Sequence, residues 1–119
     1  MNKEKEIIFT EYGEYDIEPL ISTIGGEEKL LSLTLHFPST IDGHTSRRSL
    51  WGFITITDTG EITYFTHMLG KDQKNESGWC TCKNLIHLYG EIAASHALVS
   101  MEAIEKLVER AKEAKFRFY

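Results

Sequence analysis

The alternation of apolar and polar residues is clearest in the middle of the chain, from Ser49 to Met68. This segment predicts two strands joined by a turn at residues 58–60. A three-residue turn, with Gly60 in the left-handed region that glycine permits, sets Ile56 opposite Ile62. A two-residue turn would set a threonine opposite Ile62 instead. We choose the three-residue turn because it pairs apolar residues with one another.

This register gives the predicted hairpin two different faces. The first is largely aliphatic and holds Ile54, Ile56, Ile62 and Tyr64. The second mixes aromatic and polar residues and holds Trp51, Phe53, Thr55, Thr63, Phe65 and His67. Aromatic rings on a sheet can stack with nucleic-acid bases, but such surfaces also need lysines and arginines to bind the phosphates, and few lie on this face. We therefore expect one face to pack against a helix and the other to be covered by the rest of the chain or by a partner.

Two further strands are predicted upstream, at Glu6–Tyr12 and Lys29–Phe37. The segment between them, Asp16–Ile24, is ambiguous. It reads either as a short helix that the glycine pair at 25–26 would end, or as a strand in which Pro19 needs a free edge. We prefer the short helix.

The last third of the chain favours helices. A polar loop at Leu69–Gly78 precedes a short strand, Trp79–Lys83. Helical spacing then predicts Asn84–Ala97, with Asn84 as cap, and Ser100–Lys115, with one apolar stripe. The aromatic tail, Phe116–Tyr119, is expected to pack back on the body or to add a strand.

These elements predict an α+β fold in a single domain, residues 1–119. We expect an antiparallel sheet of four or five strands, with the C-terminal helix and one further helix packed on one face. Strands precede helices along the chain, so a parallel βαβ arrangement is disfavoured.

Composition and charge limit the classes of function that this chain can have. The chain has 119 residues, of which 41% are hydrophobic and 26% charged, as in globular proteins. Residues 1–29 hold three lysines and eight acids, which accounts for the net charge of −5 of the whole chain. This acidity disfavours nucleic-acid binding, and it suits either solubility or a basic partner. No apolar run is long enough to span a membrane and the first residues lack a signal-peptide pattern, so we expect a cytoplasmic protein.

The open end of the predicted hairpin is one candidate site. The loop at Pro38–Arg48 and the loop at Leu69–Gly78 both reach that end, which gathers a rim of polar side chains. Forked hydrogen bonds from an arginine pair would suit a phosphate or a carboxylate. The alternative is two solvated loops carrying ordinary charges. The rim residues proposed for binding are His44, Arg47, Arg48, His67 and Lys71.

The two cysteines are a second candidate. Cys80 and Cys82 lack the C-x-x-C spacing of common zinc and redox sites. With His67 and His87 they could form a Cys2His2 zinc site. The alternative is that both are small hydrophobic residues on the buried face of a strand. We prefer that alternative, and so expect no metal or other cofactor.

The sequence contains no catalytic motif and favours a protein that is not an enzyme. We expect a small protein-binding module of the inhibitor, immunity or adaptor type, whose partner is another protein. Its binding surface would be the acidic N-terminal part or the aromatic face with Trp51, Phe53 and Phe65. The alternative is an anion- or nucleotide-binding domain, or a small enzyme, at Arg47, Arg48 and His67. Homodimerisation through an exposed edge strand is a further expectation.

Overall fold

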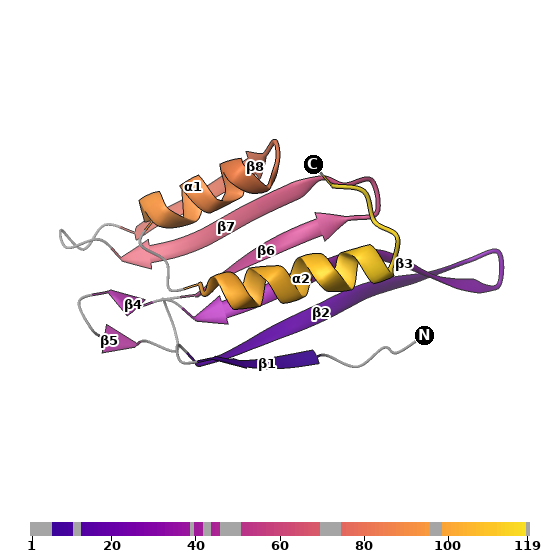
Figure 1. The fold of residues 1–119 in the computed structure, drawn as a ribbon, viewed down its shortest axis with the longest axis horizontal. Helices are drawn as coiled ribbons and strands as arrows, with labels where there is room; N and C mark the ends of the chain where they lie inside the picture. The colour runs from indigo at the N-terminus through magenta and orange to yellow at the C-terminus, as the bar shows by residue number, and fades with distance from the viewer. Residues whose placement is uncertain are drawn as a thin grey trace.

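The computed structural model describes residues 6–10, 13–38, 40–41, 44–45, 51–69, 75–95 and 99–118. Six strands form one antiparallel sheet in the order β1-β2-β3-β6-β7-β8 (Figure 1). Two short strands, β4 and β5, pair separately. The bounds are β1 Glu6–Thr10, β2 Gly13–Ile24, β3 Glu27–Pro38, β4 Thr40–Ile41, β5 His44–Thr45, β6 Trp51–Thr57, β7 Ile62–Leu69 and β8 Asn75–Cys82.

Two helices lie on the same face of this sheet (Figure 1). Helix α1, Leu85–Ser95, contacts β7 and β8, and helix α2, Met101–Glu113, contacts β1 and β3. Both start at the predicted caps. Asn84 Oδ1 accepts a hydrogen bond from the His87 N–H at 2.8 Å, and Ser100 Oγ accepts one from the Ala103 N–H at 3.1 Å. The predicted α+β class, with helices on one face, is thus confirmed.

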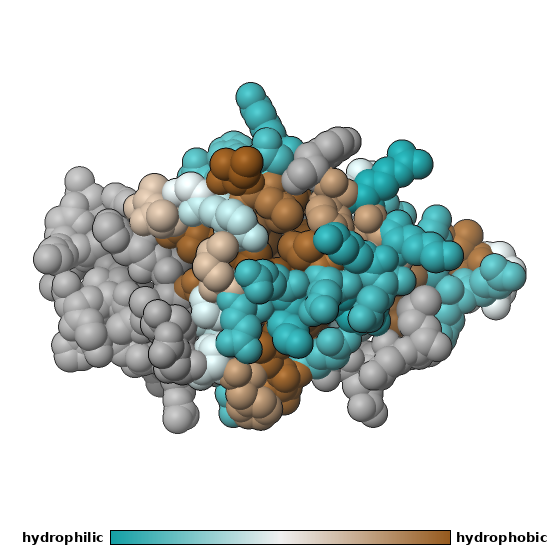
Figure 2. Space-filling view, in the orientation of Figure 1, coloured by the Kyte–Doolittle hydropathy of each residue, from teal (hydrophilic) through white to brown (hydrophobic). Residues whose placement is uncertain are grey.

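The core lies between the sheet and the two helices. The sheet supplies the alternate residues of its strands, and the helices supply their apolar stripes. The outer side of α2 is hydrophilic (Figure 2). In the tail, Phe116 is buried and Phe118 packs against the core, so the tail packs back rather than adding a strand. Among the described residues, the largest fully buried side chains are Tyr15, Ile17, Leu33, Leu35, Ile54, Ile56, Ile62, Leu88, Ile104 and Leu107.

The central hairpin has the predicted register. Ile56 pairs with Ile62, and the Gly60 N–H donates to the Thr57 carbonyl at 2.9 Å. Gly60 has a φ of +87°, in the left-handed region that glycine favours. A Cβ on Gly60 would also lie 2.2 Å from the Arg117 carbonyl oxygen, so the tail leaves no room for a side chain there. Turn geometry and tail packing therefore require the same residue.

The segment predicted as a short helix is part of a strand. Residues 16–24 continue β2, in which Tyr15 and Ile17 are fully buried and their neighbours point to the other face. Among the described residues, the pairing with β1 ends at Ile17. Within the described part of the chain, Pro19 therefore has a strand partner on one side only, which a proline tolerates.

Two other expectations need correction. The loop predicted at residues 69–78 is wrong in its second part, because β8 begins at Asn75 rather than at Trp79. The main sheet has six strands rather than four or five, since residues 13–24 form a strand of their own. Within the described residues, no helix has the length and apolar content needed to cross a membrane.

The sheet face opposite the helices is called here the open face. One row of cross-strand partners runs over all six strands, a distance of about 24 Å at ~4.8 Å per strand. A second row is rich in threonine, and in it Thr34 and Thr55 share a hydrogen bond of 3.1 Å. The first row is Ile7, Asp16, His36, Phe53, Phe65 and Trp79, and the second is Glu18, Thr34, Thr55, Thr63 and Thr81.

Candidate metal centre

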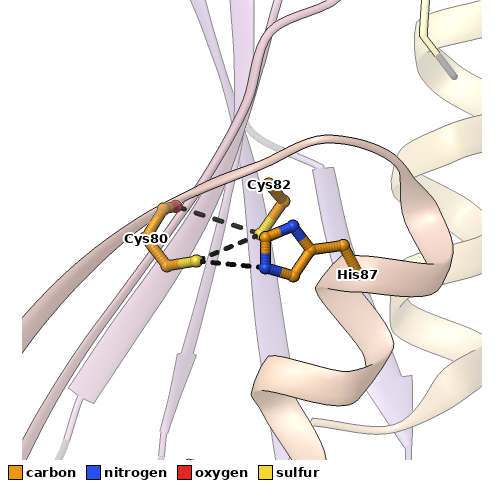
Figure 3. Close-up of side chains that lie close together, drawn as sticks. All are labelled: Cys80, Cys82 and His87. Atoms are coloured by element: carbon orange, nitrogen blue, oxygen red, sulfur yellow. Dashed lines mark hydrogen bonds between the residues drawn. The ribbon is translucent and has the colours of Figure 1, made fainter.

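A cluster of two thiols and an imidazole lies where β8 passes into α1 (Figure 3). Because side chains alternate along a strand, Cys80 and Cys82 both project to the helix-covered side of β8. Only two residues separate the end of β8 from α1, so the first turn of the helix stays beside the strand end. This turn carries His87. The strand and the helix cap together bring the three side chains to one place.

The three candidate ligand atoms lie within 4.8 Å of one another. The two sulfur atoms are 3.8 Å apart, and the Cys80 sulfur is 3.7 Å from Nε2 of His87. A carboxylate lies beside the imidazole, with Oε1 of Glu91 3.4 Å from the same Nε2. Glu91 is one helical turn after His87, so both project from the same side of α1.

Three of these separations are close to the edges of a tetrahedral zinc site. Zn–S bonds of about 2.3 Å and Zn–N or Zn–O bonds of about 2.0–2.1 Å fix the distances between ligands. Tetrahedral angles then give about 3.8 Å between two sulfurs, ~3.6 Å between sulfur and nitrogen, and ~3.3 Å between nitrogen and oxygen. The observed 3.8, 3.7 and 3.4 Å follow the same series. The separation between the Cys82 sulfur and the imidazole is longer, up to 4.8 Å, so these two groups would have to move closer together to accept an ion.

Hydrogen bonding defines the proton positions of the metal-free cluster. The Lys83 backbone N–H donates to Nδ1 of His87 at 3.0 Å. A backbone N–H can only donate, so Nδ1 is the acceptor and the neutral ring carries its proton on Nε2. That proton faces the Cys80 sulfur and the Glu91 carboxylate. A metal ion bound at Nε2 would replace it.

Burial holds Cys82 in its protonated form. The residue is 5% exposed, and its thiol lies close to both the carbonyl and the sulfur of Cys80. Desolvation by burial, followed by the hydrogen bond with Cys80, raises the pKa of Cys82 from 9.0 to about 12. A metal ion must displace this proton, because the ligand is the thiolate.

The other side of the cluster is accessible. The side chains of His87 and Glu91 are 33% and 42% exposed, and Cys80 is half-buried. An ion can therefore enter from solvent past the helix while the Cys82 sulfur remains in the protein interior.

The structure brings together three of the four residues considered for a zinc site: Cys80, Cys82 and His87. His67 is placed only as backbone in β7, and its side chain lies outside the described residues, so its role stays a prediction. Sequence reasoning missed Glu91. The signal was present, since His87 and Glu91 have the i,i+4 spacing within a predicted helix.

The anion rim stays a prediction. Arg47, Arg48 and Lys71 lie outside the described residues, and the side chains of His44 and Trp51 do as well. The other two residues proposed for binding are described and lie side by side. The rings of Phe53 and Phe65 stack on the open face with centroids 5.1 Å apart.

Comparison with known proteins gave no relative. No protein-family model, curated protein or solved structure matches the chain.

Proposed function

We propose that this chain is a zinc-binding domain in which Cys80, Cys82, His87 and Glu91 hold one ion. The observation that carries the proposal is the agreement between three ligand separations and the edges of a tetrahedral zinc site. Two sulfurs with nitrogen and oxygen ligands are a set that favours zinc over magnesium or calcium, which prefer oxygen alone.

The ion's role would be structural. Four protein ligands leave no open position for a substrate, and closed sets of this kind are typical of structural sites. The ion would join β8, which lies at the edge of the sheet, to the first turns of α1. Neither element has a partner strand or helix on its outer side among the described residues, so a metal cross-link would stabilise this end of the fold.

Zinc binding has one local cost. With the metal on Nε2, the proton of His87 moves to Nδ1, which can then no longer accept the Lys83 N–H. Losing one exposed hydrogen bond costs about 1 kcal/mol. Structural zinc sites contribute roughly 10–16 kcal/mol of apparent binding free energy. The free energy of zinc binding is much larger than the cost of this hydrogen bond, so losing the bond does not prevent zinc from binding.

A simpler explanation is that the cysteines only fill space. It accounts for Cys82, which is buried like a small hydrophobic residue. It does not account for the half-buried Cys80 beside an imidazole and a carboxylate. A purely hydrophobic role would need no polar groups around the sulfurs.

The test is metal content. The untagged protein is purified without an immobilised-metal column, and its zinc is measured by elemental mass spectrometry. We expect one zinc per chain in the wild type and a large loss in Cys80→Ser and His87→Ala. Thr81→Ser is the matched control, because Thr81 lies between the two cysteines on the opposite face and is exposed. It should keep its zinc.

Two results would contradict the proposal. One is substoichiometric zinc in the wild type even after incubation with a zinc salt under reducing conditions. The other is unchanged zinc in the Cys80 and His87 variants. Circular dichroism of each variant shows whether a loss of metal reflects a lost ligand or a lost fold.

A further inference from the structure

The open face contains a shallow hollow of about 290 Å³ next to the aromatic row. It is lined by Glu18, Leu20, Thr34, His36, Phe53 and Thr55, among others. Pockets for drug-sized ligands usually measure roughly 300–1,000 Å³, so this one lies at the lower end of that range and has room for a single side chain. Its lining offers apolar surface, hydroxyl groups, one carboxylate and the imidazole of His36, which lies near both Glu18 and Phe53.

The charge around this hollow is negative. Strand β2 presents Glu14, Asp16 and Glu18 on the open face, alternating with its buried residues. None of the open-face residues described in the two rows is a lysine or an arginine. A complementary ligand would therefore be a cation.

Aromatic rings continue from the hollow to the edge of the sheet. Phe53 lines the hollow, Phe65 stacks on it, and Trp79 packs against both with centroid separations of 5.3 and 4.7 Å. Trp79 is nevertheless 66% exposed. An exposed tryptophan in such a cluster can bind a cation through its ring face.

We infer that the open face docks an arginine-bearing segment of a partner protein, with one guanidinium seated in the hollow between Glu18 and Phe53. This inference is independent of the zinc centre, which lies on the other face of β8. The occupant is set by charge complementarity with β2. A second copy of this chain would bring the same acids to face each other across the interface, which disfavours self-association.

Arginine fits better than lysine for a geometric reason. A guanidinium is planar, so it can lie against the Phe53 ring while its edge donates two hydrogen bonds to the Glu18 carboxylate. Oε2 of Glu18 lies 3.5 Å from Nε2 of His36, and a carboxylate can accept several hydrogen bonds at once. An ammonium group makes no comparable stacked contact.

The experiment uses a fluorescein-labelled peptide of alternating glycine and arginine, titrated with the full chain and followed by fluorescence anisotropy. We expect saturable binding, and about tenfold or greater weakening in Glu18→Gln, because hydrogen bonds to a charged group are lost. Phe53→Leu should weaken binding roughly threefold to tenfold by removing the ring face. The same peptide with lysine in place of arginine should bind at least about fivefold more weakly.

The matched control is Glu102→Gln. Glu102 is exposed in the first turn of α2, on the helix-covered side, and its loss changes the net charge equally. It should leave the affinity unchanged. NMR amide shifts in the wild type should change most at Thr34, Phe53 and Thr55, which gives a readout that does not depend on any variant folding correctly.

Three results would overturn the inference. The first is no binding of the arginine peptide up to about 1 mM. The second is equal weakening by Glu18→Gln and Glu102→Gln, which would reduce the effect to net charge. The third is a concentration-dependent dimer, seen by sedimentation and abolished by Trp79→Ala, which would assign the face to a second copy of the chain.

Discussion

The two sides of β8 differ in how they assemble their groups. On the covered side, Cys80 and Cys82 meet residues of the helix that follows, so the cluster spans a short stretch of sequence. On the open side, Trp79 meets rings from β6 and β7, and the row continues to β1. One surface is built by local geometry and the other by the register of six strands. We expect the two sides to respond differently to mutation and to metal.

The largest effect should appear in the core. Ile54 is fully buried on the covered side, and Ile54→Ala should lower the free energy of unfolding by about 2–5 kcal/mol through the lost apolar contacts and the cavity left behind. Its neighbour Thr55 lies on the open face and shares a hydrogen bond with Thr34. Thr55→Ala should cost only about 1 kcal/mol. Urea unfolding measures both, and equal costs would contradict the assignment of the faces.

Metal removal should have the next largest effect. Free zinc at 100 times its dissociation constant stabilises a folded protein by about 2.7 kcal/mol. For a chain of this size, chelation should then lower Tm by roughly 10–20 °C. Differential scanning calorimetry with and without a chelator measures the shift. A Tm that is indifferent to the chelator, in protein shown to contain zinc, would mean that the ion does not stabilise the fold.

Glu91→Gln tests the fourth ligand. The amide keeps the shape of the side chain but is a poorer ligand than the carboxylate, so zinc affinity should fall about 10–100-fold. Competition with a chromophoric chelator measures this change. Glu102→Gln, in the other helix, should leave zinc affinity as it is. Equal affinities in the wild type and Glu91→Gln would assign the fourth position to water or to another residue.

The pH dependence follows from Cys82. Its pKa is raised to about 12, so near neutral pH the metal-free protein holds this thiol protonated and zinc must release the proton. Zinc affinity should therefore increase at least about tenfold for each pH unit between roughly 6 and 8. A flat profile over that range would contradict thiolate ligation by Cys82.

The same pKa sets the stability of the metal-free fold. Because the folded pKa exceeds the ordinary 9.0, protonated Cys82 favours the folded state. This contribution is complete below pH 9 and is lost as the pH rises from 9 toward 12. In Cys82→Ala, this part of the loss of stability at alkaline pH should be absent. Urea unfolding measured as a function of pH would show the difference.

Local signals in the sequence were sufficient for some elements and not for others. The hairpin register followed from one glycine and the pairing of isoleucines, and both helices began at their predicted caps. The prediction of a helix at residues 16–24 is wrong because Asp16 and Pro19 resemble the start of a helix and the two glycines resemble its end. Pairing with β3 along the whole segment overrides those signals, and such pairing is not visible in a local pattern.

The candidate site also combines features that local sequence signals predict with features that depend on the tertiary structure. The sequence placed both cysteines on one face and put His87 in the helix that follows, yet the C-x-C spacing matched no common motif. Only the two-residue link between β8 and α1 brings His87 to the sulfurs, and only the helix register adds Glu91. The row over six strands needed the full strand order, including the strand at residues 13–24.

The most direct measurement of the central claim is zinc-edge X-ray absorption on the loaded protein. The structure predicts two sulfur neighbours at about 2.3 Å and two nitrogen or oxygen neighbours at about 2.0–2.1 Å. In Cys80→Ser the sulfur count should fall to one, and in Thr81→Ser it should stay at two. A first shell of nitrogen and oxygen alone would contradict the assignment of the zinc to Cys80 and Cys82.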